Sequence, residues 1–570
     1  MKHIITIFIL FFSGLIFSQL DGNTTPNYKE LISIYTSLAN EHDEIELFQM
    51  GDSDYGLPIY LCVINGAKDS LSTFKKAQEN TTILINNAIH PGEPDGVNAC
   101  LLWINEWIAD GKSLRDIPVI GIIPAYNVGG MMNRSGTSRA NQNGPEEYGF
   151  RGNAQNLDLN RDFIKMDSKN MFTFAKIYHA LDPDVFLDTH VSNGADYQYT
   201  MTYIASVRER MSPALGDLMH DEMIPYLKLK SSKDGFDLIP YVDLKGETPE
   251  FGIQVFNDLP RYAMGYASLM NAISFTLETH MLKPFPERVK ATKVFLENTI
   301  EWTTLKQKEV EDARISAREW EMNMKYYPFS FELTEKQESI LFKGYEATVP
   351  ESEITGLKRL KYNHDKPYEK AIPHYNEYKA KDSTFISDFY IIGGQCNDVI
   401  LRLAANNIQF TRLEKDTLIQ LGECKIVAFE TGKRPYEGHY LHHDVKEELN
   451  LVALQFKKGD VIVPTKQKNK RFIVSVLEPR TPDSYFAWNF FDSYLQQKEY
   501  FSPYVFEDKA IEILKDKPWL KEELERRKQS DEDFSKSTWN QLYFIYQNSD
   551  YYEPSHNVIP IHSGMFNSGE

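Results

Sequence analysis

The stretch ILINNAIHPGEPDG, residues 83–96, decides how the rest of the chain is interpreted. Its first three residues are an apolar run typical of a buried strand, and the polar residues that follow end that strand. His90 and Glu93 then stand three residues apart, where the strand gives way to a turn. Such a pair occurs in zinc sites, but it also suits a turn histidine beside a glutamate favoured by a helix N-terminus. The pair therefore needs support from elsewhere in the sequence.

Strand-like and helix-like segments alternate through the first half of the chain, which predicts an α/β fold. We expect a mixed, mostly parallel central sheet flanked by helices. The expected strands are residues 57–64, 81–89, 117–127, 184–190 and 274–280, and the expected helices are residues 24–45, 96–109, 168–181 and 263–273. Sites in such sheets gather beyond the carboxyl ends of the strands, and His90, His190 and Glu278 each fall at or near such an end.

A hydrolytic zinc site takes three protein ligands and keeps a fourth position for water. His90 and Glu93 supply two candidates, and His190, at the end of DVFLDTH, is the natural third. In NLDLNRDF, residues 156–163, Asp158 is placed to accept a proton from the other ring nitrogen of His90. We therefore predict one Zn²⁺ on these residues.

Two further motifs contain residues suited to substrate binding and catalysis. Asn160 and Arg161 stand side by side, a pair able to clamp a carboxylate, although the same motif also suits a solvated turn. Glu278 lies in the apolar strand SFTLETH, where a carboxylate is costly to bury unless it is paired or functional. Beside zinc it would act as a general base, whereas its alternative role is a structural pair with an arginine.

In this order, HxxE, Arg-x-Asn, Asp-x-Asn-Arg, a strand-end histidine and a strand-end glutamate, the sequence resembles zinc carboxypeptidases of the carboxypeptidase A type over roughly residues 25–285. The resemblance implies that His90, Glu93 and His190 bind zinc and that Glu278 is the catalytic base and proton shuttle. It implies that Asn160 and Arg161 bind the C-terminal carboxylate of the substrate.

The resemblance also implies an arginine that stabilises the oxyanion and a mobile tyrosine that covers the substrate. Arg151 is the preferred arginine, with Arg139 and Arg134 as alternatives on the same loop. Tyr262 is the preferred tyrosine, with Tyr266 as its alternative. Ala263 and Met264 in the same region would make the side-chain pocket apolar.

These expectations define a secreted zinc metallocarboxypeptidase that hydrolyses the last peptide bond of a peptide with a free C-terminus. One alternative is an amidohydrolase of the aspartoacylase type, which acts on N-acyl amino acids, and a related variant acts on peptidoglycan stem peptides. Another is a binding module that has lost catalysis. Measured zinc content and hydrolysis of free and amidated C-termini separate these alternatives.

Composition and the N-terminal sequence limit which partners and which cellular location we expect. The 570-residue chain has a formal net charge of −19, which disfavours a nucleic-acid partner. Residues 1–18 have the pattern of a cleavable signal peptide, so we expect a secreted or periplasmic protein without stable membrane insertion after cleavage. The alternative is a transmembrane anchor, for which the apolar stretch is short. The sequence makes no prediction about oligomeric state.

We expect a catalytic domain at residues 19–325, a β-rich connector at 326–385 and a C-terminal α/β accessory region with α+β character at 386–570. Among the four cysteines, Cys396 and Cys424 either pair or stay as buried thiols. His439, His442 and His443 allow a second metal site, although an ordinary histidine-bearing loop or strand is favoured. The aromatic stretch at 482–501 indicates a domain core or interdomain contact rather than a wall of the substrate cleft.

Overall fold

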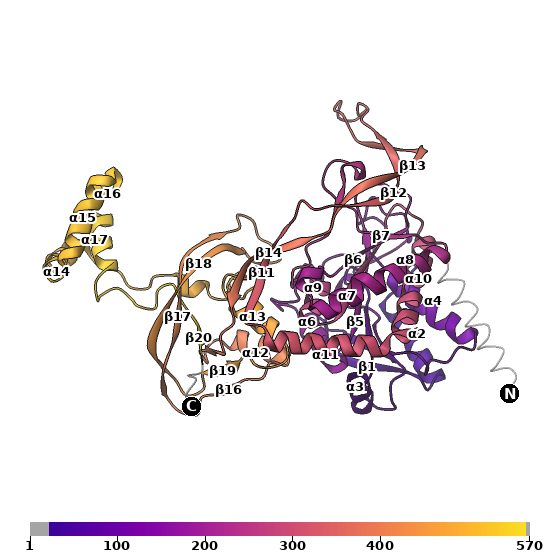
Figure 1. Ribbon diagram of the computed structural model, residues 1–570, viewed down its shortest axis with the longest axis horizontal. Helices are drawn as coiled ribbons and strands as arrows, with labels where there is room; N and C mark the ends of the chain where they lie inside the picture. Colours follow the sequence, from indigo (N-terminus) through magenta and orange to yellow (C-terminus); the bar gives the residue numbers. More distant parts are fainter. Residues whose placement is uncertain (1–21, 566–570) are drawn as a thin grey trace.

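The structure, a computed structural model, describes residues 22–565 (Figure 1). The predicted signal peptide at residues 1–18 lies outside the described residues. Within 22–565, no helix is long and apolar enough to cross a membrane.

An eight-stranded mixed sheet forms the centre of the first half of the chain, in the order β1-β2-β4-β3-β5-β10-β6-β7. Its inner strands β4, β3, β5 and β10 run parallel, and β1 and β2 pair antiparallel with their neighbours. Strand β6 is antiparallel to β10 and parallel to β7. The strands span Ile45–Asp52 (β1), Pro58–Ile64 (β2), Thr82–Asn86 (β3), Val119–Ile123 (β4), Val185–Ser192 (β5), Met201–Ala205 (β6), Leu238–Pro240 (β7) and Ile273–His280 (β10). The expectation of a mixed sheet with a parallel centre is confirmed.

Helices cover this sheet (Figure 1). They span Tyr28–Glu41 (α2), Ser70–Glu79 (α3), Asp95–Ala109 (α4), Val128–Met132 (α5), Lys169–Leu181 (α6), Pro213–Asp217 (α7), Ile224–Lys233 (α8), Ala263–Leu269 (α9), Phe285–Leu305 (α10) and Gln307–Asn323 (α11). Helix α6 illustrates why these segments are helical and cover the sheet. The Ser168 side chain caps its N-terminus, and Phe174, Ile177 and Tyr178 bury one face at helical spacing. The helix expected at 24–45 is shorter, because the chain turns at His42 and enters β1.

Buried strands position the residues of the candidate site. Every residue of β3, β4 and β5 is buried, so these strands form a rigid floor. The parallel register pairs Asn86 with Asp188, and His190 with Glu278. Because β3 and β5 are neighbours, the chain that follows β3 lies beside the end of β5. His90 and His190 therefore come together although they are 100 positions apart in sequence.

Beyond α11, the chain forms two pairs of extended strands, and the β12–β13 pair projects from the molecule (Figure 1). Strands β11 (Tyr326–Leu333) and β14 (Tyr378–Phe385) pair with each other. Strands β12 (Glu338–Thr348) and β13 (Lys361–Tyr375) form a hairpin that joins β9 (Ile253–Gln254) and β8 (Asp243–Leu244) of the first half. The connector expected at 326–385 thus contains only strands among its regular elements, while the division into domains stays a prediction.

The last part of the chain is sheet-rich. A six-stranded sheet has the order β16-β19-β15-β20-β17-β18. Its elements are β15 (Phe389–Ile392), α12 (Asn397–Ala405), β16 (Thr411–Arg412), β17 (Thr417–Thr431), β18 (His442–Phe456), β19 (Val461–Pro464), α13 (Lys470–Leu477) and β20 (Val558–Gly564). Helices α14 (Pro503–Asp516), α15 (Pro518–Ser530), α16 (Glu532–Ser535) and α17 (Thr538–Gln547) form a lobe that projects away from the sheet (Figure 1).

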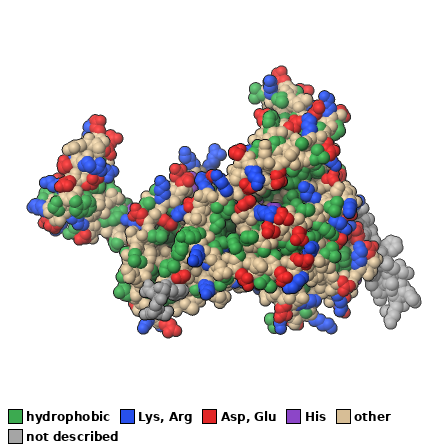
Figure 2. All heavy atoms as spheres, viewed as in Figure 1, with side chains coloured by type: hydrophobic (Ala, Val, Ile, Leu, Met, Phe, Trp, Pro, Cys, Tyr) green, Lys and Arg blue, Asp and Glu red, His purple; other side chains and the backbone are tan. Residues whose placement is uncertain are grey.

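Surface charge and cysteines add two points. Acidic and basic side chains are interspersed over the visible face, including the projecting lobe (Figure 2). All four cysteines are free, so Cys396 and Cys424 do not pair, and Cys424 is buried as the alternative expected.

Candidate metal centre

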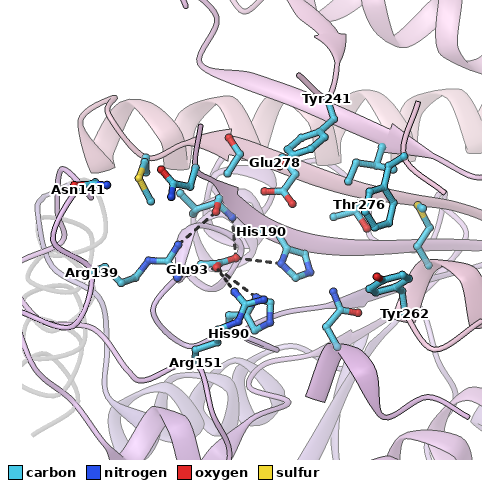
Figure 3. A pocket seen from close by; sticks show the side chains of 18 of the residues that line it. His90, Glu93, Arg139, Asn141, Arg151, His190, Tyr241, Tyr262, Thr276 and Glu278 are labelled. Carbon is cyan, nitrogen blue, oxygen red and sulfur yellow. Dashed lines mark hydrogen bonds and ion pairs between the residues drawn. The ribbon is translucent and has the colours of Figure 1, made fainter. Parts of the chain in front are cut away.

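His90, Glu93 and His190 converge in one buried cluster (Figure 3). Each offers a ligand atom, and these atoms all lie within 4.8 Å of one another. Nδ1 of His90 lies 3.3 Å from Oε1 of Glu93, and Nδ1 of His190 lies 3.1 Å from Oε2 of the same carboxylate. The three side chains predicted as zinc ligands are therefore brought to one point.

A tight turn after β3 makes this possible. Ala88 has a φ of 56°, which L-residues rarely adopt, and the Glu93 amide donates to the His90 carbonyl at 2.8 Å. A Cβ on Gly92 would lie 2.7 Å from the Arg139 side chain, so the turn needs glycine there. At Gly96, the same Cβ would lie 2.1 Å from the Thr189 hydroxyl, which shows how closely α4 approaches β5. The Pro-Gly turn thus directs both side chains to the same side.

Each histidine is held by a second carboxylate. Nε2 of His90 lies 2.9 Å from Oδ1 of Asp158, as the sequence predicts, and Nε2 of His190 lies 2.8 Å from Oδ2 of Asp188. Asp188 was not predicted, although a signal was present: residues two apart in a strand share one face, and DTH places Asp188 beside His190. Both rings therefore direct Nδ1 toward Glu93, the arrangement in which carboxylates orient zinc-binding histidines.

The cluster fits a zinc ion. Nδ1 of His90 is buried and has no hydrogen-bond partner, so a buried acceptor is left for something else to satisfy. Two imidazoles and one carboxylate are a suitable donor set for zinc. Glu93 is ionised: burial alone raises the pKa of its carboxyl, but Arg139 and the two histidines outweigh burial and hold that pKa well below its ordinary value.

Glu278 lies on β10 directly opposite His190 and faces the cavity (Figure 3). Among residues 22–565, no lysine or arginine is within ion-pair distance of Glu278, which removes the structural ion pair considered as its alternative role. Burial is the main cause that raises its pKa to about 8, and the charge of Glu93 adds to this effect. His190 and Arg151 act in the opposite direction. A carboxyl group in such a setting is able to accept and return a proton near neutral pH.

The three candidate arginines lie in different places. Arg134 donates to the backbone carbonyls of Thr25 and Glu147, and it does not line the cavity. Arg139 lines the cavity and pairs with Glu93 at 2.8 Å. Arg151 also lines the cavity, pairs with Asp158 at 2.8 Å and is 44% exposed in its side chain. Of the three, Arg151 keeps the most freedom to meet a substrate.

Asn160, Arg161 and Tyr262 line the same cavity. The Arg161 guanidinium lies 4.7 Å from the centre of the Tyr262 ring, and Oδ1 of Asn160 accepts from the Ala263 amide at 2.9 Å. This second contact leaves the amide NH₂ of Asn160 available to a ligand. Tyr266 is fully buried, donates to Asn406 at 2.6 Å and lies away from the cavity, because it stands within α9 and packs into the core against Tyr178, whereas Tyr262 precedes the helix.

The cavity that joins these residues has a volume of about 440 Å³. Of the two residues expected to make the side-chain pocket apolar, Met264 lines the cavity and Ala263 does not. The further wall residues that carry no motif in the sequence include Ile204, Tyr241, Phe256 and Thr276. Thr276 precedes Glu278 by two positions, so the shared strand face was a signal for it.

The histidines of the C-terminal half do not form one site. His439 bonds Asp167 at 2.7 Å, and His442 bonds Asp492 at 2.9 Å. His443 groups only with the exposed Glu430 and Asp444. These separate partners favour the ordinary role expected for them.

The aromatic stretch at 482–501 lies between the two halves of the chain. Trp488 is buried and packs under Arg261 and Lys165 of the first half, with the charged groups 5.2 and 5.8 Å from its ring centre. Neither Trp488 nor Phe490 lines the 440 Å³ cavity. This stretch thus contacts the first half of the chain, while its description as an interdomain contact depends on the predicted division into domains.

Comparison with known proteins agrees with this geometry. The buried His-Glu-His cluster is a donor set suited to zinc. Residues 31–225 match the family described as zinc carboxypeptidase, and this match supports a zinc metallocarboxypeptidase. The match contains all three residues of the cluster and the Asn160-Arg161 pair, while Glu278 lies beyond it.

Solved structures show distant likeness. A metallo-carboxypeptidase from Burkholderia cenocepacia is 14% identical, with 48% of this chain and 67% of that chain covered and a TM-score of 0.35. Carboxypeptidase A from Helicoverpa armigera is 15% identical, with 53% and 75% covered and a TM-score of 0.36. Bovine thrombin-activatable fibrinolysis inhibitor is 13% identical, with 50% and 98% covered and a TM-score of 0.37. None of the curated proteins matches the sequence.

Proposed function

We propose that the protein hydrolyses the C-terminal peptide bond of peptides with a free C-terminus, and that His90, Glu93 and His190 hold one zinc ion for this reaction. The observation that carries the proposal is a single cavity of about 440 Å³ whose wall contains the three candidate ligands, Glu278 and Arg161. A metal site, a proton acceptor and a carboxylate-binding cation thus face the same space.

The carboxylate-binding end sets which bond is cut. Arg161 presents a planar guanidinium suited to bidentate contact with a carboxylate, and Asn160 adds an amide donor. A chain end bound there places its last peptide bond between the clamp and the metal cluster. Tyr262, which lies 4.7 Å above Arg161 at the cavity wall, is positioned to cover that chain end. The apolar wall residues Ile204, Phe256 and Met264 are then available to the terminal side chain.

The reacting end is built around Glu278. Zinc bound to the cluster supplies a Lewis acid that makes water nucleophilic near neutral pH. Glu278 accepts a proton from the attacking water and delivers it to the nitrogen of the departing amino acid. Arg151 stabilises the negative charge that develops on the former carbonyl oxygen. Asp158 contacts both His90 and Arg151, so one carboxylate fixes the proposed zinc ligand and the proposed oxyanion arginine relative to each other.

The location follows from the first residues of the sequence. We propose that residues 1–18 direct export and are then removed, so that the mature enzyme acts outside the cytoplasm. Peptides of the surroundings, including those of a cell wall, would then be its substrates.

The proposed function is tested with the purified full chain. Zinc content should approach one ion per chain, and the protein should release single amino acids from the C-terminus of unmodified peptides. Chelation should abolish the release, and added Zn²⁺ should restore it. Hydrolysis of N-acyl amino acids without any peptide cleavage would instead support the amidohydrolase, and bound zinc without hydrolysis of either substrate would support a binding module.

A further inference from the structure

A turn from the C-terminal half reaches the segment that binds the substrate carboxylate. The loop that links β17 to β18, residues 432–441, folds back as a tight turn in which Tyr436 and His439 exchange backbone hydrogen bonds at 2.7 and 3.1 Å. At its tip, a carboxylate oxygen of Glu437 accepts a hydrogen bond from the Asp158 amide at 2.6 Å. These two residues are 279 positions apart.

The backbone at the tip does not favour glutamate. Glu437 has a φ of 50° and Gly438 a φ of 85°. Two successive residues with positive φ are typical of a type I′ turn, in which Asn-Gly or Gly-Gly is preferred. A glutamate in this left-handed conformation is disfavoured, because its Cβ comes too close to the following carbonyl oxygen. A residue held in an unfavourable backbone conformation points to a role for its side chain.

Its partner, Asp158, lies at the centre of the proposed site. The Asp158 carboxylate contacts Nε2 of His90 at 2.9 Å and Nε of Arg151 at 3.0 Å. It also accepts from the Asn160 amide at 2.9 Å and so begins the short helical turn Leu159–Arg161. A hydrogen bond to the Asp158 amide therefore fixes the backbone from which the carboxylate clamp projects.

Other contacts seat the loop against the same region. His439 bonds Asp167, beyond the clamp, at 2.7 Å, and Tyr436 stacks on Trp488 with ring centres 6.1 Å apart. Trp488 in turn packs against Arg261, the residue that precedes Tyr262, and Asp483 pairs with Arg261 at 2.8 Å. The C-terminal half thus supports both chain segments that carry the clamp.

We propose that Glu437 is a positioning residue for the substrate-carboxylate clamp, so that the C-terminal half is part of the working site. This inference rests on the proposed function for the meaning of the clamp. Glu437 does not itself line the 440 Å³ cavity. It acts through the Asp158 backbone and should influence how tightly the chain end is held more than how fast the bond is cut.

Three variants separate this role from a purely structural one. Glu437→Gly removes the carboxylate and relieves the positive φ, so thermal stability should stay the same or rise. Its KM for a C-terminal peptide should nevertheless increase roughly tenfold while kcat stays within about twofold, because a hydrogen bond to the backbone of a binding segment is lost. Glu437→Gln keeps an oxygen acceptor and should remain within about twofold of wild type in KM. Lys433→Ala, an exposed position of the same loop, is the matched control and should behave as wild type.

A readout that does not depend on activity keeps the two proposals apart. Amide hydrogen exchange in the segment 157–163 should become faster in Glu437→Gly and remain slow in Glu437→Gln. If the wild-type protein cleaves no C-terminal bond, the proposed function fails, but the exchange result still decides whether Glu437 holds the clamp segment. Unchanged KM and exchange in Glu437→Gly would overturn the inference. Equal impairment of the Gly and Gln variants would also overturn it, since charge and not the hydrogen bond would then be responsible.

Discussion

Glu278 of β10 and His190 of β5 occupy the same rung of a parallel strand pair. The proposed proton acceptor and the third proposed zinc ligand are therefore fixed relative to each other by backbone hydrogen bonds and not by flexible loops. Both side chains face the cavity from the floor of the sheet (Figure 3). A rigid floor of this kind is suited to chemistry that needs a constant distance between metal and base.

The first prediction concerns this rung. Glu278→Gln replaces the carboxylate with an amide of the same shape that cannot take a proton from water. Turnover should fall by roughly 10²–10⁴-fold, the usual contribution of a general base, while zinc content stays at the wild-type value. Metal analysis and kcat on a C-terminal peptide provide the check. Full activity in this variant would refute the role of Glu278.

The second prediction concerns the carboxylate behind His190. Asp188→Asn keeps the size of the side chain but weakens its hold on Nε2 of His190. Zinc affinity should fall about 10–100-fold, as is usual when such an outer partner of a zinc ligand is changed. Competition with a chromogenic chelator measures the affinity. Wild-type zinc affinity in Asp188→Asn would show that His190 needs no such support.

The third prediction distinguishes the candidate arginines. Arg151→Ala should lower kcat by roughly 10²–10³-fold, the range found for loss of an oxyanion donor. Arg134→Ala should keep kcat close to wild type, because Arg134 contacts backbone carbonyls outside the cavity. Steady-state kinetics on one peptide compares the two. A larger loss of kcat in Arg134→Ala than in Arg151→Ala would reverse the assignment.

The fourth prediction concerns stability in the C-terminal sheet. Glu478 is buried beside Tyr390 and Glu447, and burial, with the charge of Glu447 in addition, raises its pKa to about 7. The folded chain then binds more protons than the unfolded chain between the ordinary pKa of 4.5 and about 7. The contribution of Glu478 to the free energy of unfolding is therefore fully present below the ordinary pKa and is lost as the pH rises through the folded pKa.

Glu478→Gln should remove this loss. Relative to wild type, the variant should gain stability between pH 5 and 7 by up to about 1.4 kcal/mol per pH unit, measured by urea unfolding. Glu448→Gln, exposed on β18, is the matched control and should follow the wild-type curve. Parallel curves for wild type and Glu478→Gln would show that the buried carboxyl does not titrate in this range.

The sequence predicted the parts of the site whose signals are local. His90 and Glu93 follow an apolar strand in one short motif, and His190 and Glu278 each end a recognisable strand, so their convergence followed from the α/β pattern. Of the two candidate tyrosines, Tyr262 lines the cavity and Tyr266 is buried in the core. The roles of these residues stay predictions, while the fold and the zinc carboxypeptidase domain are confirmed.

The parts that the sequence did not reveal depend on contacts between distant segments. Tyr241 and Phe256 come from a region without periodicity, and they line the cavity close to β8 and β9, of which β9 pairs with the connector hairpin. The contact of Glu437 with Asp158 joins positions 279 residues apart, and nothing in either local sequence indicates it. Tertiary packing alone determines such residues.

We propose that the cavity binds a free chain end at Arg161 and that the bond beside this end is cut. The most direct test compares two peptides that differ only in a free or an amidated C-terminus, with wild type and Arg161→Ala. Wild type should release the terminal residue from the free peptide with at least roughly 100-fold preference, since a charged bidentate contact is lost in the amide. Arg161→Ala should lose most of this preference. Equal cleavage of both peptides by the wild-type protein would show that Arg161 does not select a free chain end.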